Sequence, residues 1–305
     1  MSDVINSILD EIKVLNEQTY KNMTVIGLNV PNGDLDLMSL EIGLDMGLVE
    51  ITELNEEGSV NEVKVINNAV TLLLLLDGEE IIGSKQNRIV NTTIIIPAKS
   101  EKIIPVSCTE KGRWHYKSSK FHYSNHMATS RVRRDKQISV SQSLRNDNSF
   151  RSKQSEVWDN IALTEDNLKV NSKSSALYDS YVQRGSDIDE YKSKFRLDEN
   201  QNGIIVYING ELVGFEIIYN SKRYGEYHSK LLESYIIDAI GKENEESVMG
   251  DLNKDELFNK IKESERESYD SVGLGVDYRL EDEEFTGSVM IYDDNLVNAS
   301  FFRKV

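Results

Sequence analysis

"LLDGEEIIGSKQNRIVNTT", residues 75–93, places a polar segment between two apolar runs that have the character of buried strands. The polar segment holds four hydrogen-bonding residues in a row: Lys85, Gln86, Asn87 and Arg88. Short apolar runs bounded by turn residues are typical of strands, whereas helices in globular proteins need about ten residues or more. The stretch therefore predicts a β-rich region whose strands end beside a concentration of charged and amide side chains.

Extended segments of the same kind fill most of residues 22–120. Val, Ile and Leu cluster or alternate in them, and turn signals such as PNGD, NEEG and PAKS separate them at short intervals. Strands at this spacing, with no helices between them, predict an antiparallel β-sandwich or a barrel-like sheet. Two dipeptides predict hairpin turns of type I′: Asp77-Gly78 in LLLDGEEII and Asn209-Gly210 in VYINGELVG.

Helical spacing of apolar residues dominates elsewhere. It predicts an N-terminal helix in residues 1–21, two helices with Ser124 and Ser152 as N-caps, a helix within 171–195, and one over 224–241 that Gly241 ends. The polar residues 137–153 predict a mobile loop.

The order of these elements predicts an α+β fold. In it, a β-rich region at 22–120 and a helical and hairpin region at 121–240 form one domain. An acidic helical insertion spans 241–270, and strands at 271–305 complete the domain.

Composition narrows the class of protein. The chain has 305 residues, of which 39% are hydrophobic and 29% charged, as in a folded globular protein. Its longest apolar run, Leu72–Leu76, is far shorter than the roughly 20 residues that span a bilayer. The single cysteine, Cys108, excludes an internal disulfide and a cysteine-based zinc site. We expect a cytoplasmic protein without a membrane segment.

The net charge of −17 is distributed unevenly. Residues 84–153 contain 15 Lys or Arg and four Asp or Glu, a net charge of +11, so the rest of the chain carries −28. This asymmetry favours an anionic small molecule as partner, although the basic segment can instead pair with the acidic remainder of the same molecule. A nucleic-acid partner would use the basic run SRVRRDK, but the surrounding negative charge disfavours it. A protein partner stays open, and the sequence does not indicate a cofactor.

Candidate site residues gather in three polar clusters. Lys85, Gln86, Asn87 and Arg88 form a donor-rich loop suited to phosphate oxygens, and Arg113 with Trp114 suits a planar, charged ligand such as a nucleotide. Glu80 and Glu110 lie at strand ends near cations and are the candidates for general acid/base catalysis. Gln154 and Trp158 stand four residues apart and would share a helix face. The alternative for all of them is structural: ion pairs of Glu80 and Glu110 with Lys85 and Arg113, and an indole that anchors the sheet to the helices.

Two weaker candidates complete the set. Cys108 follows an apolar strand, where a buried thiol is more usual than a nucleophile, although His115 or Lys111 would be available as a base. His122 and His126, at helical spacing, would be able to bind a metal, but no Glu motif accompanies them and a surface pair is favoured. We therefore assign no metal site.

The segments DGEEIIGSKQNRIVNTT, IPVSCTEKGRW, QSEVW and NGELVGFEII together resemble the ARPP-1 domain family, whose name records an association with ADP-ribosylglycohydrolases and rhodanese-phosphatase proteins. The resemblance covers roughly residues 22–240 and 271–303. It implies a link to ADP-ribose or NAD metabolism, without an activity or site residues of its own.

Two hypotheses follow. In the first, the protein binds a phosphate-bearing molecule of the ADP-ribose or NAD type at a rim where residues 85–88 face Glu110–Trp114, with hydrolysis by Glu80 or Glu110 as an extension. In the second, it is a non-catalytic interaction or structural module whose polar cluster is internally paired.

Overall fold

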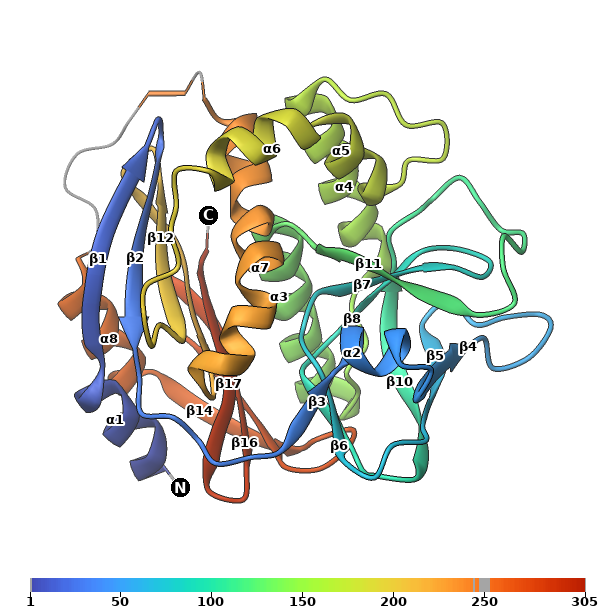
Figure 1. Ribbon diagram of the computed structural model, residues 1–305, viewed down its shortest axis with the longest axis horizontal. Helices are drawn as coiled ribbons and strands as arrows, with labels where there is room; N and C mark the ends of the chain where they lie inside the picture. Colours follow the sequence, from blue (N-terminus) through green and yellow to red (C-terminus); the bar gives the residue numbers. More distant parts are fainter. Residues whose placement is uncertain (1, 244, 247–252, 305) are drawn as a thin grey trace. The chain divides into compact units, whose positions relative to one another are not determined.

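A computed structural model describes residues 2–243, 245–246 and 253–304, and these form two compact units (Figure 1). The terminal unit comprises Met1–Leu35, Gly185–Tyr269 and Gly275–Val305, and the central unit comprises Asp36–Arg184 and Asp270–Leu274. Both units combine helices with antiparallel strands, which confirms the predicted α+β class. None of the described helices is long and apolar enough to cross a membrane.

An eight-stranded sheet is the framework of the terminal unit. Its order is β1 (Lys13–Tyr20), β2 (Met23–Asn29), β12 (Gly203–Ile208), β13 (Glu211–Ile218), β17 (Asn295–Arg303), β16 (Phe285–Tyr292), β15 (Val276–Glu281) and β14 (Glu265–Asp270). Each neighbouring pair from β1 to β15 is antiparallel. The predicted Asn209-Gly210 turn joins β12 to β13 and is confirmed, since both residues have the positive φ that a type I′ turn requires (52° and 81°).

Successive residues along the strands of this sheet point to its two opposite faces. Phe215 packs in one apolar core with α1 (Ser2–Glu11) and α8 (Lys254–Glu263). The next residue along, Gly214, faces Tyr235 of the long helix α7 (Ser221–Gly241), which packs on the opposite face and against α6 (Gly185–Lys192) (Figure 1). The predicted helix ending at Gly241 is confirmed.

A half-barrel forms the β-rich part of the central unit, as the barrel-like prediction required. Its antiparallel order is β11 (Phe121–Met127), β7 (Glu79–Gly83), β8 (Arg88–Val90), β10 (Ser100–Cys108), β5 (Glu62–Asn67) and β4 (Val49–Thr52). The first part of β10 pairs with β5 and its last part with β8, so the sheet turns along this strand. A smaller sheet of β3 (Leu37–Ser39), β6 (Leu72–Leu75) and β9 (Ile94–Ile96) contributes to the same apolar core. The helices of this unit are α2 (Leu40–Asp45), α3 (Ser130–Asp147), α4 (Gln154–Leu168) and α5 (Leu177–Gln183).

The prediction of a hairpin at Asp77-Gly78 is wrong. The strands on either side belong to different sheets, because β6 pairs with β3 and β9 while β7 pairs with β8 and β11. The turn closes with the Glu79 amide donating to the Leu76 carbonyl at 3.2 Å. Only Gly78 has a positive φ (83°), as the third residue of a type II turn requires.

The predicted helix capped by Ser124 is also wrong. Residues 121–127 form the edge strand β11, because pairing with β7 overrides the helical spacing of their side chains. The helix begins at Ser130 instead, after Thr129, whose hydroxyl accepts the Val132 amide at 3.3 Å.

The predicted mobile loop at 137–153 is mostly helix, since α3 runs to Asp147. Its polar residues tolerate a helix because hydroxyls such as that of Ser141 donate to a carbonyl one turn earlier. Ser152 is not the cap of α4, because Lys153 occupies that position and the Ser152 hydroxyl hydrogen-bonds to Ser107.

Three other helix predictions need correction. The first helix ends at Glu11, and residues 13–20 form the strand β1, which pairs with β2. Residues 171–195 contain two short helices, α5 and α6, instead of one. In the predicted helical insertion 241–270, the described residues 253–270 contain one α-helix, α8, and residues 265–270 form β14. Residues 244 and 247–252 lie outside the described part.

Candidate polar cluster of the central unit

Two loops about 25 residues apart converge at one end of the half-barrel, as the sequence suggested. The β8–β10 ladder ends with Arg88 opposite Cys108, so the segments that precede one and follow the other lie together. The Thr109 amide donates to the Asn87 carbonyl at 2.9 Å, and the Asn87 amide donates to the Glu110 carboxylate at 3.3 Å. This junction brings together most of the predicted site residues: Lys85, Gln86, Asn87, Arg88, Glu110, Arg113 and Trp114.

Arg113 joins the two loops through hydrogen bonds from both terminal nitrogens of its guanidinium group. Its Nη1 donates to the carbonyls of Ser84 (2.6 Å) and His115 (3.0 Å). Its Nη2 donates to the Gly83 carbonyl (3.1 Å), to Oδ1 of Asn87 (3.2 Å) and to the carboxylate of Glu110 (2.6 Å). With 7% of its surface exposed, the guanidinium is occupied by the protein itself and orders the loop around it.

Glu110 is held ionised by this arrangement. Burial alone would raise the pKa of its carboxyl group. The hydrogen bond and charge of Arg113, together with hydrogen bonds from Ser174 and the Asn87 amide, outweigh burial and lower the pKa. The ion pair with Arg113 that was the structural alternative is therefore present.

Arg88 and Lys85 are also engaged internally. Arg88 is fully buried, donates to Oε1 of Gln86 at 3.2 Å and lies 3.8 Å from the Glu53 carboxylate, and burial lowers its pKa. The Lys85 ammonium donates to the carbonyls of residues 56 and 57 at 2.5 and 2.6 Å. Sequence reasoning missed Glu53, because no local pattern connects it with a loop 32 residues later; its carboxylate also accepts the Ser84 hydroxyl at 3.0 Å.

Trp114 stands at the exposed side of this cluster. Its side chain is 44% exposed, and the Lys85 ammonium and the Arg88 guanidinium lie 5.4 and 5.7 Å from the centre of its ring. Such cation contacts favour a fixed position of the indole. Tyr116, at 47% exposure, lies beside it, with the Lys85 ammonium 5.0 Å from its ring.

Glu80 lies on the other face of the same sheet. Directly opposed residues share a face and successive residues alternate, so the pairs Ile81–Arg88 and Glu80–Ile89 point in opposite directions. The two acid/base candidates thus have different partners, and Glu80 does not pair with Lys85 or Arg113, although the charge of Glu110 contributes to raising the pKa of Glu80.

The surroundings of Glu80 favour its neutral form. The carboxyl group is fully buried, and its Oε1 accepts the Thr109 hydroxyl at 2.8 Å. Its Oε2 is buried and has no hydrogen-bond partner of acceptable geometry in the described part of the chain. Burial raises the pKa of Glu80 to about 7, although Thr109, His126 and Ser124 offset part of the effect. Glu80 is therefore poised to take up or release a proton near neutral pH.

Gln154 and Trp158 lie on α4, one turn apart. The Gln154 side chain accepts the Cys108 amide at 2.7 Å and donates to the Cys108 carbonyl at 2.9 Å, which fixes the start of α4 to the end of β10. The Trp158 ring lies 5.5 Å from the Lys111 ammonium, and its buried Nε1 has no hydrogen-bond partner among the described residues. Burial raises the pKa of the Cys108 thiol to about 11, so the thiol is protonated at neutral pH, unlike an activated nucleophile.

His122 and His126 lie on the strand β11, so the helical i,i+4 geometry considered for a metal site does not apply to them. The His126 ring stacks on Tyr181 with 4.4 Å between ring centres. Within the described residues, no group of three or more His, Cys, Asp or Glu is placed to hold a metal ion.

A further buried ion pair uses part of the basic segment. The Lys136 ammonium, on α3, contacts the Asp77 carboxylate and donates to the Asn91 carbonyl at 2.8 Å. Both charged side chains are almost fully buried. Asp77, which the sequence marked only as a turn residue, is thus an acceptor for a distant lysine.

Comparison with known families agrees with the resemblance noted in the sequence. Residues 11–302 match the ARPP-1 family, described as the ARG and Rhodanese-Phosphatase-superfamily-associated Protein domain. The chain belongs to the ARPP-1 family. The match covers both compact units, so the ARPP-1 domain of this chain includes the eight-stranded sheet as well as the half-barrel. No curated protein matches the sequence, and no solved structure matches it.

Proposed function

We propose that this ARPP-1 protein binds a phosphate-bearing small molecule of the ADP-ribose or NAD type on the exposed side of the polar cluster. The observation that carries the proposal is Trp114, an exposed indole held by two buried cations. An aromatic face in a fixed position suits stacking of a nucleobase. The association recorded in the family name points to the same class of ligand.

The cluster then has a supporting role in the site. Lys85, Arg88 and Arg113 are already bonded within the protein, so they hold the loop and do not need to contact phosphate directly. The exposed Lys111 and Lys117 on the same loop are the cations available to a ligand. A loop ordered before binding loses less entropy when the ligand arrives.

Calorimetric titration with ADP-ribose and NAD tests this proposal. We expect binding that Trp114→Ala weakens about tenfold, in line with roughly 1–3 kcal/mol per stacked base. Trp114→Phe, which keeps an aromatic face, should retain most of the affinity and serves as the matched control. An absence of binding at millimolar ligand, or equal affinities of the Ala and Phe variants, would overturn the proposal.

Turnover is a second candidate function, and the observation that favours it is Glu80, whose buried carboxyl group lies on the opposite face of the sheet from Arg88. A substrate would have to reach it from that face. A buried carboxyl group with a pKa of about 7, whose Oε2 has no hydrogen-bond partner of acceptable geometry among the described residues, has the properties of a general acid or base. Glu110, held ionised by Arg113, is better suited to positioning the loop. Incubation with ADP-ribose followed by chromatography tests for hydrolysis, and an unchanged ligand would remove this candidate.

The non-catalytic alternative also has a specific observation in its favour. Each charged residue of the cluster is bonded to other residues of the cluster or to the backbone, so a purely structural role accounts for these contacts. If neither ligand binds, the cluster is the support of an interaction module, and the ligand proposal fails.

A further inference from the structure

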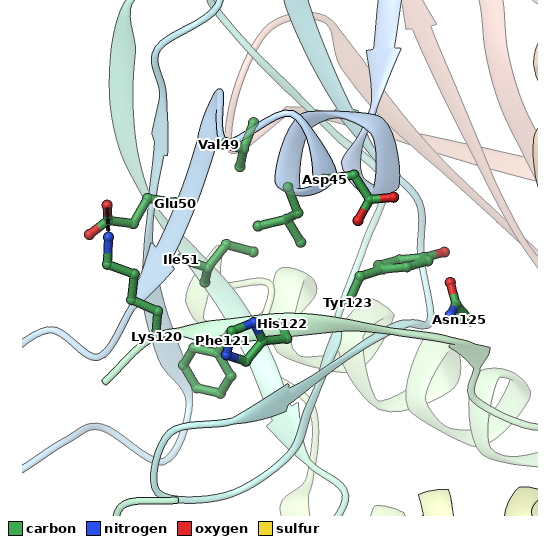
Figure 2. Close-up of a pocket in the computed structure, with 11 residues that line it drawn as sticks. Asp45, Val49, Glu50, Ile51, Lys120, Phe121, His122, Tyr123 and Asn125 are labelled. Atoms are coloured by element: carbon green, nitrogen blue, oxygen red, sulfur yellow. Dashed lines mark hydrogen bonds and ion pairs between the residues drawn. The ribbon is translucent and has the colours of Figure 1, made fainter. Parts of the chain in front are cut away.

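A groove in the central unit lies between the two ends of the six-stranded sheet (Figure 2). Its volume is about 370 Å³, and it is lined by α2 and its following turn, by β4 and by β11. We call it the β4–β11 groove. The volume is within the range of sites that bind small ligands or a few residues of a peptide, roughly 300–1,000 Å³.

Three polar side chains of this groove are unengaged. Asp45, His122 and Asn125 make no side-chain hydrogen bond or ion pair with any described residue. The half-buried side chains of Leu44 and Tyr123 also line the groove, whereas Ile51 and Phe121 are buried beneath it. Figure 2 shows Asp45 of α2 near Tyr123 and Asn125 of β11, while Glu50 and Lys120 form an ion pair at the other end. An apolar surface with a few convergent polar groups is the usual composition of a binding site.

Asp45 occupies an unfavourable position for the helix itself. It is the last residue of α2, and no basic residue lies in that last turn. A carboxylate at the C-terminal end of a helix is repelled by the helix dipole. A charged residue in such an unfavourable position, with no partner in the described part of the protein, is a candidate to contact a ligand. A ligand cation would supply the missing partner.

Both strands that line the groove have an unpaired edge. In the described chain β11 pairs only with β7, and β4 only with β5. The backbone groups on an unpaired edge are available to an added strand. The register of β11 also shifts between Tyr123 and Met127, and such irregularities often lie at functional sites.

We propose that the β4–β11 groove binds an extended peptide segment that carries a basic side chain. The peptide adds to the edge of β11 through its backbone, and its Lys or Arg pairs with Asp45. His122 and Asn125 contribute hydrogen bonds, and the alternate apolar side chains of the peptide cover the half-buried Leu44 and Tyr123. This site is separate from the ligand proposed for the loop around Trp114.

Selection from a phage-displayed library of random dodecapeptides on the intact protein tests the proposal. We expect enriched peptides with Lys or Arg flanked by β-branched residues. A synthetic peptide of the enriched sequence should bind at least fivefold more weakly to Asp45→Asn. Asp159→Asn removes an exposed carboxylate of α4, away from the groove, and should leave the affinity unchanged.

Three results decide against the peptide. No enrichment above a library panned on an unrelated protein would overturn the proposal, and so would equal effects of Asp45→Asn and Asp159→Asn. The third is competition by cadaverine, a free diamine, combined with full binding of a peptide whose backbone amides are N-methylated. That combination would show a site for small cations that does not use the strand edge.

Discussion

The pKa values of the Glu80 and Glu110 carboxyl groups shift in opposite directions, although both residues lie at the same sheet. Burial raises the pKa of Glu80 to about 7, and the Thr109 hydroxyl and the charge of His126 offset only part of this effect. Glu110 lies against the guanidinium of Arg113, which lowers its pKa despite burial. Each shift is also a statement about stability, because a pKa that differs between the folded and unfolded states makes unfolding depend on pH.

The two residues should therefore respond to pH with opposite signs. A folded-state pKa of about 7 means that stability from neutral Glu80 is present below about pH 4.5 and is lost as the pH rises through 7. Glu80→Gln mimics the neutral form and should raise the melting temperature at pH 8 more than at pH 5. In free energy of unfolding, the gain from Glu80→Gln at pH 8 exceeds the gain at pH 5 by at most about 3 kcal/mol, because one unit of pKa shift corresponds to roughly 1.4 kcal/mol.

Glu110→Gln is the matched comparison. Its ionised form stabilises the fold above the unfolded pKa, and this contribution is lost as the pH falls, so the Gln variant should be destabilised at pH 8 and less so at low pH. Thermal melts of both variants from pH 4 to 8 provide the measurement. If Glu80→Gln is less stable than the parent protein at pH 8, burial does not disfavour the ionised form of Glu80, and the raised pKa is contradicted.

At the scale of elements, apolar patterning predicted the strands better than the helices. Most of the short runs in residues 22–108 form strands because their side chains enter a common core. The prediction of strands with no helices between them is wrong at residues 40–45, which form the helix α2. Residues 121–127 and 137–147 were misassigned for opposite reasons. Helical spacing in the first gave way to an edge pairing with β7, and the polar character of the second concealed a helix whose hydroxyls bond to its own carbonyls.

The candidate site was predictable to the same limited extent. The convergence of residues 85–88 with 110–114 follows from neighbouring strands that end at one side of the sheet. The pairing inside the cluster was not predictable, because Glu53 joins it from a distant loop. Opposite directions for Glu80 and Arg88 depend on the β7–β8 register, which the sequence does not encode locally.

Gln154 should be the main polar attachment of α4 to β10. Gln154→Ala leaves the amide and carbonyl of Cys108 without partners in a half-buried place, which typically costs about 1–3 kcal/mol. Gln183→Ala is the control, since Gln183 makes the same two-bond contact with Asn171 at an exposed site where water can replace it. Denaturant unfolding of both variants measures the difference, and equal losses would argue against a buried attachment.

For the whole molecule, the charge asymmetry is partly resolved within the central unit. Arg88, Arg113 and Lys136 belong to the basic segment, and each lies against a buried carboxylate of the same unit. The +11 of the segment therefore overstates the cationic surface that a ligand meets. This favours recognition by a few exposed side chains over long-range attraction of a polyanion.

A segment from the C-terminal part of the sequence packs against β9 of the central unit. Residues Asp270–Leu274 return to the central unit from the C-terminal part of the sequence, and the Leu274 amide donates to the Ile95 carbonyl at 2.9 Å. Gly273 permits this approach, because a Cβ there would lie 1.9 Å from the Ile95 carbonyl oxygen.

Gly273→Ala should therefore displace the segment from β9 and destabilise the protein by about 1–3 kcal/mol or more. Gly185→Ala meets no atom within 4 Å and is the control. Thermal melts combined with hydrogen exchange at residues 94–96 measure the effect. Faster exchange there in Gly273→Ala alone would show that this C-terminal segment secures the half-barrel unit, whereas unchanged exchange would show that β9 is held by β6 without it.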